Sequence, residues 1–236
     1  MMLARVIRAI IFDLDGTLVN SLPGIAASLN RVLDNNGLPT HPESAVRRFI
    51  GNGILKLVER GAPDHFRAAQ VQQLTEAVAA DYASSWQQGT TPYPGVAEVL
   101  RTLLAQGTGI AVLSNKPDVF CQHMTDFLFP DVTFSSVVGQ REGVPVKPDP
   151  AGALEVARSL HLDPGEIAFV GDSTIDLATA HNAAMTSVAV SWGYHDLPAL
   201  RSASPDHLIE HISQLPAIIK LNSAAGFTKT NANSKL

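Results

Sequence analysis

The chain has 236 residues, a length that suits one large domain or two modest ones. Hydrophobic residues make up 45% of it, which is enough for a sizeable core. The 17 Lys and Arg against 22 Asp and Glu give a net charge of -5, which provides no general basis for binding nucleic acid. The single cysteine, Cys121, excludes an internal disulfide and is typical of a reducing, cytoplasmic location. No apolar run has the long core of a signal peptide or approaches the roughly 20 residues of a membrane helix, so no membrane partner is expected.

The chain begins with an apolar run, Val6 to Phe12, that predicts a buried strand. The run ends in Asp13-Leu14-Asp15-Gly16-Thr17, where the two aspartates would share one face of an extended chain. Gly16 lets the chain turn sharply and exposes backbone N–H groups, and Thr17 can help cap the next segment. Two acids at the carboxyl end of a strand can form a metal and nucleophile site. The alternative is a strand followed by a simple Asx-type turn.

Residues 19–91 carry apolar side chains at helical spacing, and no convincing strand occurs between Leu18 and Gln88. A first helix is predicted to begin near Leu22 and to end at Asn36-Gly37. Further helices are predicted over Ala45–Ile50, Ile54–Arg60 and Phe66–Trp86. The segment therefore predicts an all-helical domain, inserted into the rest of the chain as a cap over the edge of a sheet.

Beyond Gly95, helices alternate with strands, which predicts an α/β fold with a parallel, doubly wound sheet. The expected strands are Gly109–Leu113, Val132–Val138, Ile167–Val170, Ser187–Val190 and, more weakly, His207–Ile209. The expected helices are Val96–Gln106, Val119–Phe127, Ala151–Leu160, Ile175–Ala184 and one near Leu215–Leu221. The predicted domains are an α/β core over residues 1–18 and 92–221, a helical cap over 19–91 and a disordered polar tail over 222–236.

Polar residues follow several of the predicted strands. Asp13 and Asp15, Ser114-Asn115 and Gly171-Asp172 each come directly after a strand, and Lys147 lies in a proline-braced loop after the third strand. Each one alone could be a turn residue, a solvated cation or a helix N-cap. Ligands of open α/β sheets bind beyond the carboxyl ends of the strands, so four such positions at one edge indicate a single site.

Four segments resemble the four ordered motifs of the haloacid dehalogenase superfamily: Asp13-Leu14-Asp15-Gly16-Thr17, Ser114-Asn115-Lys116, Lys147-Pro148 and Gly171-Asp172-Ser173-Thr174-Ile175-Asp176. The resemblance covers roughly Val6 to Val190. A helical insertion between the first and second motifs is typical of one subgroup. Within that subgroup the segments at 12–21, 48–53 and 93–96 are most similar to the phosphoglycolate phosphatases. The chain departs from the family at Ala183-Ala184, where Ala-Gly is frequent at a helix end, and a small packing change is expected.

The resemblance implies Mg2+-dependent hydrolysis of a small phosphate monoester, with 2-phosphoglycolate favoured as substrate. Asp13 would attack phosphorus to give an aspartyl-phosphate. Asp15 would protonate the leaving alkoxide and then activate water. The superfamily's dehalogenases lack the second aspartate, because a halide leaves without a proton, so Asp15 favours phosphoryl transfer.

The resemblance also implies a ligand set. Asp13 and Asp172 would bind Mg2+ through their carboxylates and Asp15 through its main-chain carbonyl. The phosphate oxygens would be held by a set of groups that can donate hydrogen bonds: Gly16, Ser114, Asn115 and Lys147. Asp176 would support the site by orienting Lys147 or a metal-bound water, or would be a surface helix acid.

Substrate choice is expected to come from the inserted helices. One of the cations Arg47, Arg48, Lys56 and Arg60 could pair with a substrate carboxylate, or all four could be solvated. The expected partner is a small phosphorylated metabolite, bound by a monomer or homodimer. Alternative functions are another small-molecule phosphatase, a pyrophosphate or nucleotide hydrolase, a phosphosugar mutase and a non-catalytic phosphate-binding module.

Overall fold

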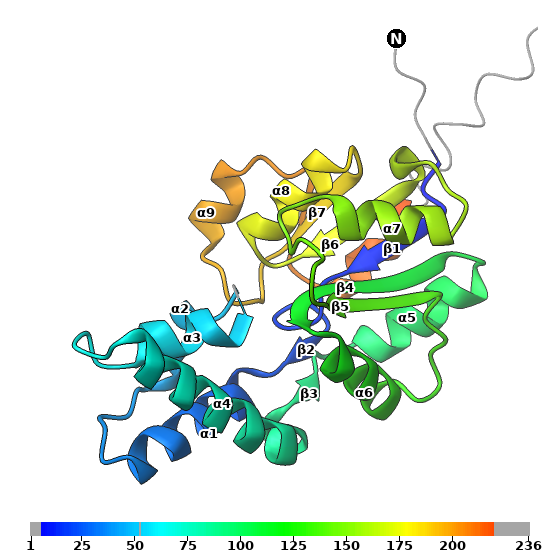
Figure 1. The fold of residues 1–236 in the computed structure, drawn as a ribbon. Helices are drawn as coiled ribbons and strands as arrows, with labels where there is room; N and C mark the ends of the chain where they lie inside the picture. The colour runs from blue at the N-terminus through cyan, green and yellow to red at the C-terminus, as the bar shows by residue number, and fades with distance from the viewer. Residues whose placement is uncertain (1–5, 52, 220–236) are drawn as a thin grey trace, which may run out of the picture.

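The computed structural model describes residues 6–51 and 53–219. A parallel sheet of six strands, in the order β5-β4-β1-β6-β7-β8, forms the centre of the described chain (Figure 1). The strands are β1 (Ala9–Phe12), β4 (Gly109–Pro117), β5 (Ser136–Gln140), β6 (Ile167–Gly171), β7 (Thr186–Val190) and β8 (His207–Ile209). Strand β1 pairs with β4 on one side and with β6 on the other, so the strand order reverses beside β1. The predicted doubly wound sheet is confirmed.

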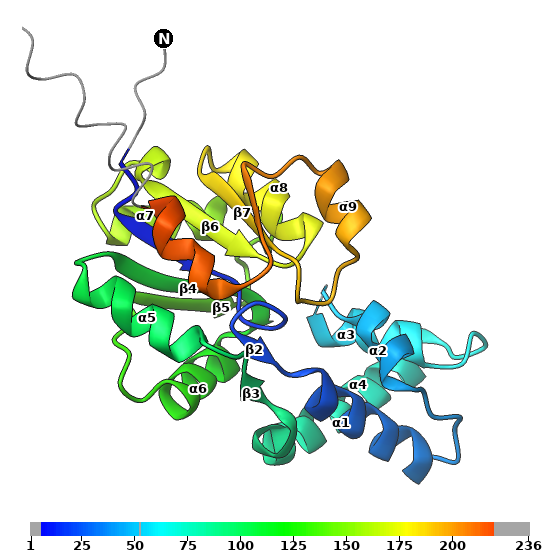
Figure 2. The same cartoon turned by 180° about the vertical axis from the view of Figure 1, so that it is seen from behind.

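Helices cover both faces of this sheet (Figure 2). Alternate residues of β1 enter opposite cores: Ile10 and Phe12 pack with helices α5 and α6, and Ile11 packs with α7 and α8. The helices of this part are α5 (Val96–Ala105), α6 (Asp118–Leu128), α7 (Ala151–Ser159), α8 (Thr174–Asn182) and α9 (Leu197–Ser202), with short 3-10 turns η2 (Pro164–Glu166) and η3 (Ile212–Gln214). Every helix of the described ranges is too short or too polar to cross a lipid bilayer.

Helices α1 to α4, which we call the helical segment, lie together beside the sheet (Figure 1). They are α1 (Leu22–Asn35), α2 (Glu43–Phe49), α3 (Gly53–Gly61) and α4 (Ala68–Ser85), followed by the 3-10 turn η1 (Trp86–Gly89). They have a hydrophobic core of their own, which includes Leu29, Leu33, Leu57, Leu74 and Val78. Spacings of three and four residues place these side chains on one face of each helix, which is why the sequence pattern found the segment.

The two ends of the helical segment meet in a small antiparallel sheet. Strand β2 (Val19–Asn20) pairs with β3 (Thr91–Pro92), and the N–H of Tyr93 donates to the carbonyl of Leu18 at 3.0 Å. The prediction that no strand lies between Leu18 and Gln88 was therefore wrong. A strand of two residues is too short to show alternation in the sequence.

Several predicted boundaries also move. Strand β4 continues to Pro117 rather than ending at Leu113, and β5 begins at Ser136 rather than Val132. Residues 215–219 are helical, while the remainder of the last expected helix and the expected tail lie outside the described residues. Ala184, the departure from the family pattern, has a φ of 57°, a left-handed conformation that favours glycine after a helix.

Candidate active site

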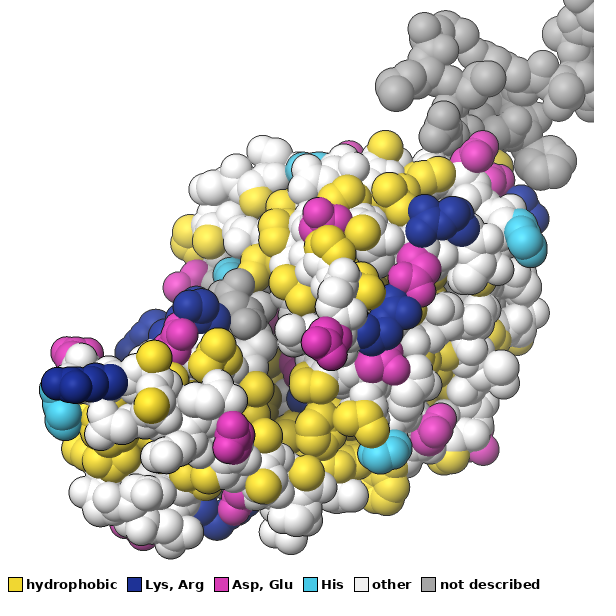
Figure 3. All heavy atoms as spheres, viewed as in Figure 1, with side chains coloured by type: hydrophobic (Ala, Val, Ile, Leu, Met, Phe, Trp, Pro, Cys, Tyr) yellow, Lys and Arg dark blue, Asp and Glu magenta, His cyan; other side chains and the backbone are white. Residues whose placement is uncertain are grey.

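A cavity of about 140 Å³ lies between the carboxyl ends of the central strands and the helical segment. Figure 3 shows the surface hollowed between these two parts of the molecule. The core contributes six of the predicted site residues to its lining: Asp13, Asp15, Ser114, Asn115, Lys147 and Asp172. The helical segment contributes mostly apolar side chains: Ile25, Ile50, Ile54, Leu57, Val78 and Tyr82. The cavity thus has a charged floor and an apolar wall.

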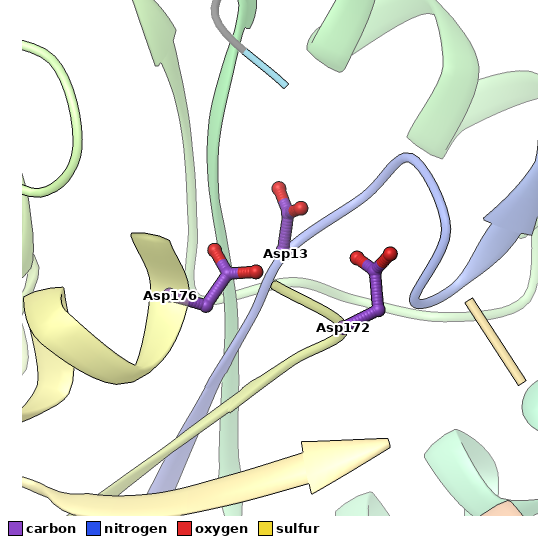
Figure 4. Close-up of side chains that lie close together, drawn as sticks. All are labelled: Asp13, Asp172 and Asp176. Carbon is purple, nitrogen blue, oxygen red and sulfur yellow. The ribbon is translucent and has the colours of Figure 1, made fainter. Parts of the chain in front are cut away.

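Three buried aspartates meet at this end of the cavity, which Asp13 and Asp172 line and Asp176 does not (Figure 4). One carboxylate oxygen each of Asp13, Asp172 and Asp176 lies within 4.8 Å of the others. Asp13 follows β1, Asp172 follows β6, and Asp176 lies in the first turn of α8. The parallel register of β1 and β6, which aligns Phe12 with Val170, brings the first two side chains together.

Lys147 supplies the positive charge of this cluster. Its Nζ lies 2.7 Å from Asp13 Oδ1 and 2.7 Å from Asp176 Oδ1, and its side chain is 4% exposed. The side-chain amide of Asn115 holds the lysine's backbone, accepting from its N–H at 2.9 Å and donating to its carbonyl at 3.1 Å. The side chain of Asn115 therefore positions the loop that carries Lys147.

Burial dominates the proton affinity of these acids. It raises the pKa of Asp13 to about 6, an effect that Lys147 opposes and Asp176 reinforces. Burial raises the pKa of Asp172 to about 8, and the charges of Asp176 and Asp13 add to the increase. The pKa of Lys147 lies above its ordinary value, because these two carboxylates, Asp13 and Asp176, outweigh the effect of burial. The Lys147 ammonium thus pairs with two of the three carboxylates, and Asp13 and Asp172, whose pKa values are raised, hold negative charge poorly without a further cation.

The donor set fits a hard divalent cation. Asp176 is already engaged: Oδ1 accepts from Lys147, and Oδ2 accepts from the N–H and hydroxyl of Ser173 at 3.0 and 2.6 Å. Asp13 Oδ1 is buried and, apart from its ion pair, receives no hydrogen bond of standard geometry from the described residues. Oxygen ligands of this kind are those that Mg2+ prefers.

Glycine is required beside the cluster. Gly16 has a φ of 87°, and a Cβ atom on it would lie 2.5 Å from Asp172 Oδ2. The hydroxyl of Thr17 donates to Asp172 Oδ1 at 3.1 Å. The first motif is therefore packed directly against the fourth, and a side chain at position 16 would displace the acid.

The carboxylate of Asp15 points to a different group of residues, at the junction with the helical segment. Lys116 Nζ lies 2.9 Å from Asp15 Oδ2 and 3.2 Å from Oδ1, and the Ser21 hydroxyl donates to Oδ1 at 2.6 Å. Lys116 also donates to the hydroxyl of Tyr82 at 3.0 Å, and its ammonium lies 4.7 Å from the centre of that ring. Burial lowers the pKa of Lys116, but the charges and hydrogen bonds of Asp15 and Tyr82 together outweigh it, so the pKa is raised. Lys116 belongs to the second motif, but the sequence pattern alone assigned it no role.

A loop after β7 also contacts the site, although no sequence motif predicted it. The N–H of Tyr194 donates to Asp172 Oδ2 at 2.7 Å, and its hydroxyl accepts from the N–H groups of Ser21 and Leu22 at 2.9 and 3.0 Å. Arg47 of α2 donates to the carbonyls of Gly193 and Tyr194, both at 2.8 Å. The loop therefore connects the acidic cluster with both the start of α1 and helix α2. The sequence feature that could have indicated this loop is Trp192-Gly193-Tyr194, a glycine between two aromatic residues shortly after a strand.

None of the four cations proposed for substrate choice lines the cavity in the described chain. Arg48 donates to the carbonyl of Ser44 within α2, and Lys56 pairs with Glu59 on α3. Arg60 donates to the carbonyl of Phe49. These three side chains are bound to their own helices or neighbours, and Arg47 is bound to the loop after β7.

Comparison with known proteins supports the assignment of the motifs. Residues 10–190 match the family model described as haloacid dehalogenase-like hydrolase. The chain is 35% identical over 221 residues to the phosphoglycolate phosphatase of Pectobacterium atrosepticum, covering 92% of this chain and 94% of that protein. It is 36% identical over 218 residues to that of Yersinia pestis, covering 91% and 94%. A crystal structure described as a predicted phosphoglycolate phosphatase from Haemophilus somnus aligns with a TM-score of 0.84 and 32% identity, covering 90% of this chain and 97% of that one.

Proposed function

Because the chain belongs to the haloacid dehalogenase-like hydrolase family, we propose that it hydrolyses a small phosphate monoester, 2-phosphoglycolate before others, through an aspartyl-phosphate formed on Asp13. The observation that carries this proposal is the grouping of Asp13, Asp172 and Asp176 beside a small cavity, with Lys147 paired to Asp13 and Asp176. The relatives named phosphoglycolate phosphatase, which match most of the chain, support the choice of substrate.

Mg2+ is the metal that we assign to the cluster. The carboxylates of Asp13 and Asp172 and the main-chain carbonyl of Asp15 would hold it. When bound, it offsets the repulsion between the phosphate and the carboxylate nucleophile. Asp176, with both oxygens engaged by Lys147 and Ser173, acts as a positioning residue that keeps the lysine in place.

The chain's own groups account for both halves of the reaction. An oxygen of Asp13 attacks phosphorus, and the bond from phosphorus to the alcohol oxygen breaks. Asp15 gives its proton to the departing alkoxide. Asp15 then takes a proton from a water whose oxygen attacks the aspartyl-phosphate, which releases phosphate and regenerates Asp13.

Charge on the transferred group would be held by donors from β4 and from the loop after β5. We assign this role to the backbone N–H group of Asn115, the hydroxyl of Ser114 and the ammonium of Lys147. The N–H of Gly16, which was also predicted to hold phosphate, donates instead to the carbonyl of Val19 at 2.9 Å. A buried setting strengthens each of these interactions compared with water.

We assign the helical segment, residues 19–91, the role of a cap on a core formed by residues 1–18 and 92–221. The paired strands β2 and β3 would serve as its hinge. Its apolar wall excludes water and favours small substrates. The cytoplasmic location and the monomeric or dimeric state stay predictions from the sequence.

Phosphate release from a panel of small phosphomonoesters, with Mg2+ and with a chelator, tests the proposal. We expect the highest kcat/KM with 2-phosphoglycolate, complete loss on chelation and no turnover by Asp13→Asn. Asp34→Asn, an exposed aspartate on α1, is the matched control and should keep full activity. Pyrophosphate, nucleotides and sugar phosphates in the same panel separate the alternative hydrolases. Near-normal turnover by Asp13→Asn would refute the assignment.

A further inference from the structure

Two lysines line the cavity in the described part of the chain, Lys147 and Lys116, and no arginine does. Lys147 lies between Asp13 and Asp176 at the phosphate end of the site. His195 also lines the cavity, but burial lowers the pKa of its imidazole, which disfavours the charged ring. A second anionic group on a substrate, besides its phosphate, therefore has Lys116 as its cationic partner.

The ammonium of Lys116 is suited to hold such a group. It has three N–H donors, and the described residues provide two partner groups, the carboxylate of Asp15 and the hydroxyl of Tyr82. The rest of the wall above it is apolar, formed by residues such as Ile54, Leu57 and Val78. Because an anion buried against that wall without a partner is strongly disfavoured, a second charged group is directed toward Lys116.

The spacing of Asp15 and Lys116 restricts where that group sits on the substrate. In the proposed mechanism Asp15 protonates the ester oxygen. Lys116 Nζ lies only 2.9 Å from Asp15 Oδ2. Because these two side chains are adjacent, a ligand that contacts both of them can carry its ester oxygen and its anionic group on one carbon atom. A carboxylate attached to the carbon that bears the phosphate ester meets this condition.

We propose that Lys116 determines substrate specificity by binding the carboxylate of 2-(phosphonooxy)carboxylic acids, of which 2-phosphoglycolate is the smallest. The inference rests on the proposed function, because it uses Asp15 as the group at the ester oxygen. Tyr82, on α4, contributes to the position of the ammonium, so recognition of the carboxylate is completed by a residue of the helical segment. Lys116 itself, the group that binds the carboxylate, lies near the end of β4.

The test compares 2-phosphoglycolate with 2-hydroxyethyl phosphate, which has the same skeleton but a hydroxymethyl group in place of the carboxylate. We expect the wild type to favour the carboxylate. In Lys116→Met the ratio of the two kcat/KM values should fall by about 10- to 100-fold, the effect of one hydrogen bond to a charged group. Lys116→Arg should keep part of the preference, and Lys56→Met, a lysine outside the cavity, should keep all of it.

The ratio isolates recognition, since any disturbance of Asp15 by the substitution lowers both rates together. An unchanged ratio in a folded Lys116→Met enzyme would overturn the inference. A measurement on the wild type serves if that variant does not fold. 3-Phosphonopropionate, in which a CH2 group replaces the ester oxygen of 2-phosphoglycolate, should inhibit at least about 10-fold more tightly than propylphosphonate, and equal inhibition would overturn the inference. Failure of the proposed function is distinct, because the wild type would then hydrolyse neither substrate.

Discussion

Gly193 is packed so closely against Asp172 that a Cβ atom on the glycine would lie 2.1 Å from the Cβ of the aspartate. The next residue, Tyr194, donates its N–H to the same carboxylate at 2.7 Å. Backbone from the loop after β7 therefore fixes the position of an acid that belongs to the loop after β6. Distances of this size leave no room for adjustment by a side-chain rotation of Asp172 alone.

Gly193→Ala should therefore displace Asp172 and weaken metal binding. We expect the Mg2+ concentration for half-maximal activity to rise by at least about 10-fold, the effect of roughly 1.4 kcal/mol on the metal site. A Mg2+ titration of activity measures this. Gly143→Ala is the control and should keep the Mg2+ requirement of the wild type. Gly143 has a φ of 72°, so the substitution strains the backbone there, but an added Cβ atom would meet nothing within 4 Å. An unchanged Mg2+ requirement in Gly193→Ala would contradict the role of this contact.

Asp15→Asn should separate the two halves of the proposed reaction. The amide cannot deprotonate water, so the aspartyl-phosphate on Asp13 should accumulate. Intact-protein mass spectrometry after mixing with p-nitrophenyl phosphate, whose leaving group needs little proton transfer, should show the added phosphoryl group. The double variant that also carries Asp13→Asn should show none. Steady-state turnover like that of the wild type would be incompatible with Asp15 as the acid and base.

Proton and metal should compete for Asp172. Burial raises its pKa to about 8, so without metal the folded chain binds this proton more tightly than the unfolded chain does. This group therefore stabilises the metal-free fold at low pH, and the stabilisation is lost as the pH rises toward 8. Mg2+ needs the ionised form, so its stabilising effect should grow over the same range.

Thermal unfolding with and without Mg2+ at about pH 6 and about pH 9 measures this competition. We expect the increase in Tm caused by Mg2+ to be larger at the higher pH. In Asp172→Asn the increase should be small at both values. A Mg2+ effect on wild-type Tm that is equal at the two values would exclude Asp172 as the titrating ligand.

Ala184→Gly should stabilise the protein. Ala184 is exposed and has a φ of 57°, so its methyl group makes little packing contribution while its backbone is in a conformation that glycine adopts more easily. We expect the free energy of unfolding to increase by about 0.5–1 kcal/mol, measured by denaturant titration, with unchanged kcat/KM. Ala203→Gly, at a helix end with a φ of -76°, should not stabilise.

Much of the fold was predictable from the sequence, because its signals are local. The alternation of apolar strands with amphipathic helices predicted the parallel sheet, and the carboxyl-end rule placed Asp13, Lys147 and Asp172 at one edge. The register of β1 with β6 then brought two of these residues together. Helical spacing likewise predicted α1 to α4 as a separate group.

The details of the site depend on contacts between distant parts of the chain. Lys116 lies 101 residues from Asp15, and Tyr194 lies 173 from Ser21. A sequence pattern shows that a lysine or tyrosine is present but not which distant group it faces. For the same reason Arg47 could be expected to meet a substrate, although the backbone carbonyls of Gly193 and Tyr194 occupy it.

The pairing of Val19–Asn20 with Thr91–Pro92 brings the two ends of a long insertion to neighbouring positions in space. Because the chain enters and leaves the helical segment at almost the same place, an insertion of another length or shape could be grafted there without altering the strands that carry the acids. In this way related enzymes can acquire different inserted segments, and so different substrates, while the acids that carry out the reaction stay in place.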